Sequence, residues 1–148
     1  MRIYVDVCCL NRPFDDQTQE RIRSETAAVK AVLDAVSVGQ HRWVTSTAVE
    51  FEISRCQDAV RRSVLQVLLE LGAETVSLNA RALELAETIA ETGLRGIDAI
   101  HLALAEEAGC DVFLTTDDDL LHKGQILARP LRIRVLNPIE WVREVLER

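Results

Sequence analysis

The chain has 148 residues, and its 17 lysines and arginines against 24 aspartates and glutamates give a formal net charge of -7. This acidic balance excludes simple attraction of nucleic acid to a basic surface, but not a nuclease whose carboxylates hold divalent cations. With 48% hydrophobic residues and no apolar run near the roughly 18 residues of a membrane helix, we expect residues 1–148 to form a single cytoplasmic domain without membrane contact. The cysteines lack the spacing of a zinc site and are interpreted as small core residues: Cys8, Cys9, Cys56 and Cys110.

The first half of the chain alternates short apolar runs with segments of helical spacing. Gly39 is suited to end one helix and Ser46 to cap the next. In chain order we predict a strand at residues 3–5, a loop through Pro13, a helix over residues 20–38, a strand at residues 43–45 and a helical segment over residues 48–72 with a break near Asp58.

The second half repeats this alternation. We predict a strand at residues 75–78, a helix capped by Asn79, an apolar helix over residues 97–108, strands at residues 112–115 and 133–136, and a helix from Pro138. Strands that alternate with helices predict an α/β fold with three layers, α/β/α, around a mostly parallel central sheet. In such sheets ligands bind beyond the carboxyl ends of the strands.

Two aspartates follow predicted strands directly. Asp6 comes after Ile3-Tyr4-Val5, and Asp117 follows the run from Val112 to Thr116. Taken singly, each is typical of a turn or a helix cap. Because parallel strands end at the same edge of a sheet, the pair together favours a carboxylate site there.

Asp98 stands at the start of the apolar helix predicted over residues 97–108. It can complement the helix dipole as an ordinary first-turn acid. The helix is apolar nearly all round and therefore expected to be buried, and a carboxylate near a core needs a cation or hydrogen bonds to compensate its charge. We interpret His101, one turn further on, as a packed core histidine rather than a metal ligand.

A fourth acid is expected from the helix after Ser46, which contains Glu50 and Glu52. On a helix Glu52 shares a face with the apolar Val49, whereas Glu50 lies on the side of Ser54. We therefore prefer Glu52 as the functional carboxylate, although a different helix start would exchange the two.

Four gathered carboxylates repel one another unless a positive charge lies among them. Oxygen ligands without a cysteine or histidine cluster suit Mg²⁺ or Mn²⁺ better than Zn²⁺. One such ion, or two, can promote attack of water on a phosphodiester. The predicted reaction is metal-assisted phosphoryl transfer to water.

Several segments, in this order, resemble those of the PIN-domain family and of its VapC-like members. The segments are Val5-Asp6 with Leu10-Asn11, Ser46 with Glu52-Ile53, Asp98-Ala99-Ile100-His101-Leu102-Ala103, and Leu114-Thr115-Thr116-Asp117-Asp118-Asp119-Leu120. They span most of the chain. The resemblance implies a Mg²⁺- or Mn²⁺-dependent ribonuclease, often a toxin restrained by a protein antitoxin, and often a homodimer.

The resemblance also implies roles for individual residues. It places Thr115 at the family's hydroxyl position and the acidic quartet at Asp6, Glu52, Asp98 and Asp117. Asp119 is an additional carboxylate that we expect to help hold a second ion. The chain departs from the family pattern at Val7-Cys8, where Thr or Ser commonly follows the first aspartate, and at Leu120, where Phe is common.

The loop after Asp6 contains Arg12 and Phe14, with Arg21 and Arg23 beyond it, and is a candidate for contact with an RNA phosphate or a looped-out base, although it also fits a solvated loop. Further basic residues suit contact with phosphate or an antitoxin but equally fit surface charge: Arg61-Arg62 and the set Arg129, Arg132 and Arg134.

The competing hypotheses differ in chemistry. The departures near Asp6 motivate a second hypothesis, a non-catalytic PIN-like binding module, and a PIN nuclease in RNA maturation or decay is an alternative to a toxin. A phosphoaspartyl enzyme is disfavoured because Asp6 is followed by Val7 and Cys8 rather than by the Asp-x-Asp pattern of one such class, and because the chain has no glycine-rich phosphate loop.

Overall fold

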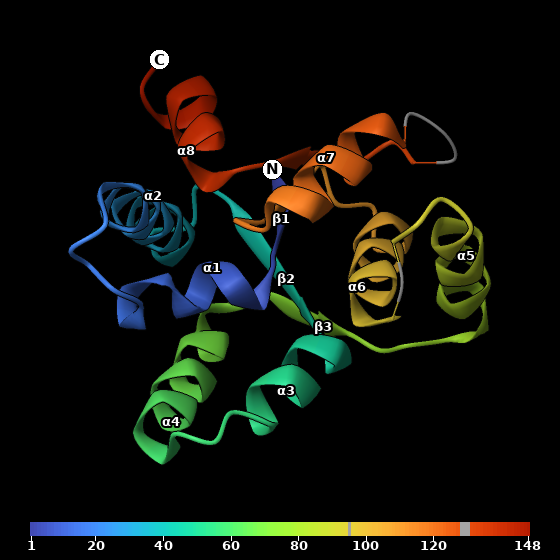
Figure 1. The fold of residues 1–148 in the computed structure, drawn as a ribbon, viewed down its shortest axis with the longest axis horizontal. Helices are drawn as coiled ribbons and strands as arrows, with labels where there is room; N and C mark the ends of the chain where they lie inside the picture. The colour runs from blue at the N-terminus through green and yellow to red at the C-terminus, as the bar shows by residue number, and fades with distance from the viewer. Residues whose placement is uncertain (95, 128–130) are drawn as a thin grey trace.

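The computed structural model describes residues 1–94, 96–127 and 131–148, and within them five parallel strands form one sheet. The strand order is β3-β2-β1-β4-β5, with α2 and α4 on one side and α5, α6 and α7 on the other (Figure 1). The predicted α/β/α arrangement with a parallel sheet is confirmed. The strands are β1 (Arg2–Val5), β2 (Arg42–Ser46), β3 (Glu74–Val76), β4 (Val112–Leu114) and β5 (Arg134–Leu136).

The helices that flank the sheet include short 3-10 turns, labelled η, and a final π-helical turn. In chain order they are α1 (Val7–Asn11), η1 (Arg12–Phe14), α2 (Glu20–Ser37), α3 (Thr47–Ser54), α4 (Ala59–Leu68), η2 (Leu69–Leu71), α5 (Ala80–Ala90), α6 (Gly96–Glu107), α7 (Asp118–Ile126), α8 (Pro138–Trp141) and η3 (Val142–Leu146). None of the helices described here combines the length and the apolar character needed to cross a bilayer.

Side-chain caps begin several helices where the sequence places them. The Ser46 hydroxyl accepts from the N–H of Val49, and the Asn79 side chain accepts from the N–H of Ala82. Asp58 caps α4, so the predicted break in the 48–72 segment is a true boundary between α3 and α4. These short-range contacts explain why local patterns predict the boundaries well.

Two helices occupy segments for which no helix is predicted. α1 replaces the first part of the loop expected before Pro13; it is one turn long, and its Cys9 and Leu10 are fully buried. α7 begins in the run of aspartates, where Asp117 accepts from the N–H groups of Asp119 and Leu120. Tertiary burial forms the first helix, and an acidic first turn that complements the helix dipole stabilises the second.

The central strand β1 places the site at the carboxyl edge of the sheet. Tyr4 pairs with Val44 on β2 and with Phe113 on β4, and its ring stacks on Phe113 with 5.2 Å between centroids. The ladder continues past the strand, because the N–H of Asp6 donates to the carbonyl of Leu114 at 2.9 Å. The strand order reverses between β1 and β4, which is the position where open parallel sheets form a ligand crevice.

A fully buried carboxylate, not predicted from the sequence, braces the elements around this edge. Glu25 on α2 has a side-chain exposure of 0% and accepts from Arg12 Nε at 2.9 Å, from Arg21 Nε at 3.4 Å and from Asn137 Nδ2 at 2.5 Å. Its partners belong to η1, to α2 and to the cap of α8. Glu25 therefore ties α2 to the preceding turn η1 and to the start of α8, which is distant in sequence.

We predict that Glu25→Ala lowers the free energy of unfolding by about 3–5 kcal/mol, since it leaves a guanidinium and an amide without their buried partner. Urea unfolding measures this loss. Glu87→Ala, on the exposed face of α5, is the matched control and should change stability by no more than about 0.5 kcal/mol. Equal small losses in both variants would contradict the bracing role of Glu25.

Candidate metal centre

Asp6 lies at the carboxyl end of β1 with only 6% of its surface exposed. Its Oδ2 accepts from the Thr115 hydroxyl at 2.8 Å and from the Cys8 thiol at 3.3 Å, and its Oδ1 accepts from the N–H of Val7 at 2.9 Å. Burial raises the pKa of Asp6 well above its usual value, and the negative charge of Glu52 adds to the rise. The carboxylate is thus preorganised but costly to ionise without a cation.

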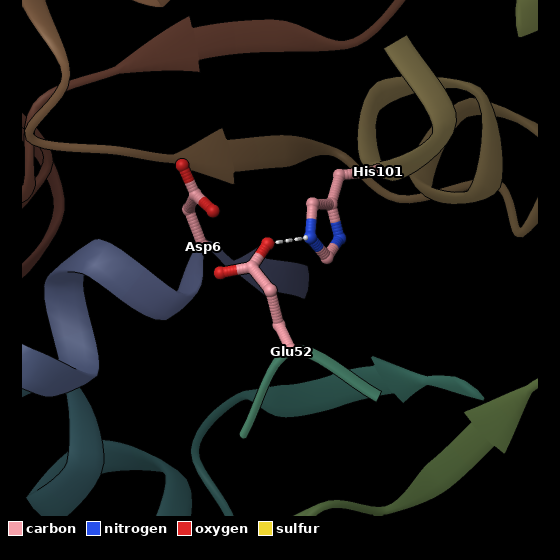
Figure 2. A group of neighbouring side chains, drawn as sticks. All are labelled: Asp6, Glu52 and His101. Carbon is pink, nitrogen blue, oxygen red and sulfur yellow. Dashed lines mark hydrogen bonds and ion pairs between the residues drawn. The ribbon is translucent and has the colours of Figure 1, made fainter. Parts of the chain in front are cut away.

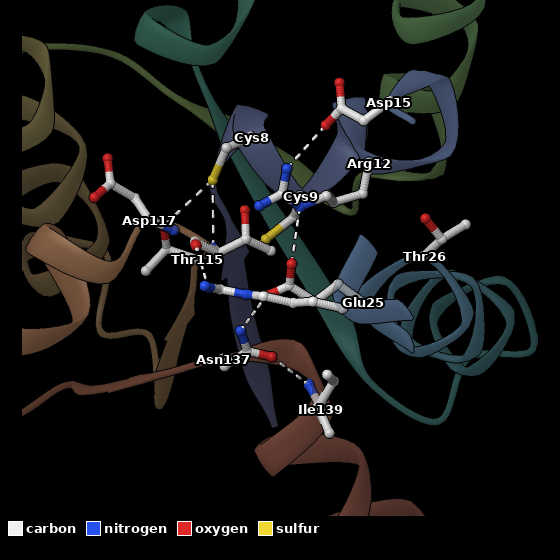
Figure 3. Close-up of polar contacts among 12 residues, drawn as sticks. Cys8, Cys9, Arg12, Asp15, Glu25, Thr26, Thr115, Asp117, Asn137 and Ile139 are labelled. Atoms are coloured by element: carbon white, nitrogen blue, oxygen red, sulfur yellow. Dashed lines mark hydrogen bonds and ion pairs between the residues drawn. The ribbon is translucent and has the colours of Figure 1, made fainter. Parts of the chain in front are cut away.

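Cys8 departs from the expectation that the cysteines only fill the core. It is half-buried, and its sulfur lies 3.3 Å from the Thr115 hydroxyl and accepts from the N–H of Thr116 at 3.4 Å (Figure 3). In the pattern described above, Thr or Ser commonly follows the first aspartate. Here Val7 and Cys8 follow Asp6, and the Cys8 thiol contacts its carboxylate. Cys9 and Cys110 are buried as expected, and the four cysteines are free thiols.

Glu52 on α3 and His101 on α6 complete a compact group with Asp6. One ligand atom from each of the three residues lies within 4.8 Å of the others, and Glu52 Oε1 is 2.7 Å from His101 Nε2. Figure 2 shows the three side chains converging from the end of β1, from α3 and from α6. Glu50, the alternative glutamate, is exposed on the other side of α3.

Asp98 and Asp117 flank this group but lie outside the 4.8 Å set. Asp98 is half-buried on the first turn of α6, and burial raises its pKa, followed by the negative charge of Asp117. Asp117 is exposed, and its Oδ1 is committed to capping α7. The charge of Glu52 also raises the pKa of Asp98, so Asp98 feels the negative charge of both neighbouring carboxylates.

Asp119 is not brought into the group. Its carboxylate is exposed on α7 and pairs with Lys123 Nζ at 3.0 Å, one turn along the same helix. Its part in holding a second ion stays a prediction.

The predicted phosphate contacts are largely engaged within the protein. Arg12 pairs with Glu25 and Asp15, and Arg21 donates to both oxygens of Asp118 at 2.8 and 2.7 Å (Figure 3 shows the Arg12 contacts). The guanidinium of Arg61 lies over the ring of Phe14 at 5.0 Å. Arg129 lies outside the described residues, as part of 128–130.

The donor set fits a hard divalent cation. Within the described residues, Asp6, Glu52, Asp98 and Asp117 make no ion pair with a lysine or arginine, and Glu52 contacts His101. Carboxylate oxygens are the ligands that Mg²⁺ and Mn²⁺ prefer.

Comparison with known proteins gives one family and one fold. The PIN domain family model matches residues 3–125. Among solved structures, the chain is similar to a chain in the crystal structure of VapBC2 from Rickettsia felis bound to a DNA fragment from their promoter, with a TM-score of 0.59 and 12% sequence identity over 93% of this chain and 98% of that one. A search of curated protein sequences finds no match.

The raised pKa values of Asp6 and Asp98 predict how stability depends on pH and metal. Both groups have a folded pKa above the unfolded value of about 4, so the stability they contribute is present below that value and is lost as pH rises through the folded pKa. Since cations bind the ionised form, we expect saturating MnCl₂ to raise the melting temperature by about 3–10 °C near pH 7.5 and much less near pH 5.

Asp6→Asn separates the two effects in the same thermal melts. It removes a buried charge, so the metal-free variant should melt above the parent near pH 7.5 and should lose most of the response to Mn²⁺. A variant that responds to Mn²⁺ as strongly as the parent would place the ion elsewhere.

Proposed function

The chain belongs to the PIN-domain family, whose members are generally nucleases, and from that premise we propose that it is a Mg²⁺- or Mn²⁺-dependent endoribonuclease that hydrolyses RNA phosphodiester bonds. The main support is the close approach of the buried Asp6 and the partly exposed Glu52, at the point where the strand order reverses.

The four carboxylates have different proposed roles. Asp6, Asp98 and Asp117 hold the cation through their oxygens, and Glu52 either adds an oxygen or orients the attacking water. When bound, the cation supplies positive charge for the charge that develops on the phosphate. Thr115 keeps one Asp6 oxygen in place by its hydrogen bond. The water would attack phosphorus directly while the bond from phosphorus to the leaving ribose oxygen breaks, without a covalent enzyme intermediate.

We further propose that the protein is the toxin of a type II toxin–antitoxin system, cytoplasmic and homodimeric. The similar fold of a chain in a VapBC2 crystal structure supports this role, with an antitoxin as partner. A surface suited to a protein partner is present on α4, where side chains at helical spacing are exposed: Val60 by 74%, Val64 by 41% and Val67 by 62%. A role in RNA maturation or decay would require the same chemistry without such a partner.

We expect Asp98→Asn to lower RNA cleavage by at least about 100-fold, because it removes an oxygen charge that the cation needs. The measurement is cleavage of a mixed RNA pool after removal of metal with EDTA and re-addition of Mg²⁺ or Mn²⁺. Circular dichroism confirms that the variant is folded.

Two glutamates on one helix provide the matched control. Glu52→Gln should lower cleavage strongly, whereas Glu50→Gln should retain it within about threefold because its side chain is exposed on the other side of α3. If folded Asp98→Asn cleaves as fast as the parent, the proposed site is wrong. If Mn²⁺ stabilises the parent but no RNA is cleaved, the protein is a non-catalytic PIN-like module.

A further inference from the structure

A chain of buried polar side chains runs from the cap of α3 to the metal centre. The hydroxyl of Tyr4 lies 2.6 Å from Ser46 Oγ and 2.6 Å from His101 Nδ1, and His101 Nε2 lies 2.7 Å from Glu52 Oε1. Ser46, Tyr4 and His101 each have 0% of their surface exposed. We propose that His101, with its ring tautomer fixed by Tyr4 and Ser46, is a positioning residue that holds Glu52 toward the metal centre and does not itself bind the metal.

The available protons fix the direction of the hydrogen bonds that join Ser46, Tyr4, His101 and Glu52. Glu52 is an acceptor when ionised, so His101 Nε2 must carry a proton and donate it. Nδ1 of a neutral imidazole then has a lone pair and accepts from the Tyr4 hydroxyl. The Tyr4 oxygen in turn accepts from the Ser46 hydroxyl. Every donor in this direction meets an acceptor.

The reverse direction leaves a conflict. With the proton on Nδ1, His101 would donate to Tyr4 and Tyr4 to Ser46, and the lone pair of Nε2 would face the carboxylate of Glu52 at 2.7 Å. In that direction Ser46 Oγ would accept from both Tyr4 and the N–H of Val49, and its own proton would have no acceptor among the described residues. The packing therefore selects the Nε2–H tautomer.

This arrangement removes His101 from the set of metal ligands, although its nitrogen lies within the 4.8 Å group. A histidine binds a metal through a ring lone pair. Here Nε2 carries a proton for Glu52, and the Nδ1 lone pair accepts from Tyr4. What His101 supplies is orientation, since it fixes one oxygen of Glu52.

The second oxygen, Oε2, has no hydrogen-bond partner among the described residues and is free to face a cation or water. Ser46 both caps α3, which carries Glu52, and ends the hydrogen-bonded chain. The position of the helix and the rotamer of its glutamate are therefore set by one connected network. The part of this inference that concerns catalysis rests on the proposed function.

The tautomer is tested by ¹⁵N NMR of the imidazole rings in the metal-free protein, which does not depend on activity. The chain has three histidines, and the signal that disappears in His101→Gln belongs to His101. We expect a neutral ring with the proton on Nε2, unchanged when Mg²⁺ is added and altered in Tyr4→Phe. A proton on Nδ1, or loss of the Nε2 proton on addition of Mg²⁺, would overturn the proposal.

Kinetics test the positioning role. His101→Leu should lower kcat by about 10- to 100-fold and leave KM for RNA within about threefold, because the lost contact orients a catalytic group and does not touch RNA. His101→Gln places an amide N–H near the position of Nε2 and should recover most of kcat. Tyr4→Phe keeps the ring that stacks on Phe113 but removes the hydroxyl, and it should also lower kcat. It provides a second variant if His101→Leu does not fold.

Thr45→Val is the matched control for loss of a buried hydroxyl. Thr45 on β2 bonds to Thr75 on β3 and takes no part in the contacts of His101. It should retain the parent kcat. Mn²⁺ affinity measured by electron paramagnetic resonance gives a second readout: His101→Gln should bind Mn²⁺ like the parent, and an equal loss of affinity in His101→Gln and His101→Leu would identify His101 as a ligand. If the parent cleaves no RNA, the proposed function fails, while the NMR and Mn²⁺ measurements still decide the role of His101.

Discussion

Repulsion between partly buried carboxylates is the constraint around which the site is built. Asp6 is the extreme case, because it is nearly inaccessible and its pKa is raised by burial. Among the residues that the structure describes, Arg12 and Arg21 do not relieve this charge, because Arg12 pairs with Glu25 and Arg21 with Asp118. Both guanidinium groups are engaged by other carboxylates, which leaves the charge of Asp6 available for a cation.

The parts of the site that follow from topology could be predicted from the sequence. A parallel sheet sends every strand end to one edge, so Asp6 and the segment before Asp117 had to lie near each other. Helical spacing also separated Glu52 from Glu50 once Ser46 was taken as the cap. Both inferences use only local pattern and chain direction, which a single sequence contains.

The parts that depend on tertiary partners could not be predicted. α1 is too short to show a helical period, and it exists because Cys9 and Leu10 are buried. In the sequence, Glu25 resembles an ordinary glutamate on an amphipathic helix; the fold brings Arg12 to it from the preceding turn and Asn137 from a distant segment. In the same way, His101 is buried as expected of a core histidine, but its contacts with Tyr4 and Glu52 join residues from three separate elements.

The chemical nature of the group that holds Glu52 affects the net charge around the carboxylates of the site. A lysine or arginine at that position would bring a fixed positive charge beside the carboxylates and would compete with a divalent cation for them. A neutral imidazole donates a hydrogen bond to Glu52 without adding charge, and a tyrosine donor at Nδ1 keeps it in the donating tautomer. Buried neutral groups of the protein thereby orient Glu52, while neutralisation of the carboxylate charge is left to a cation.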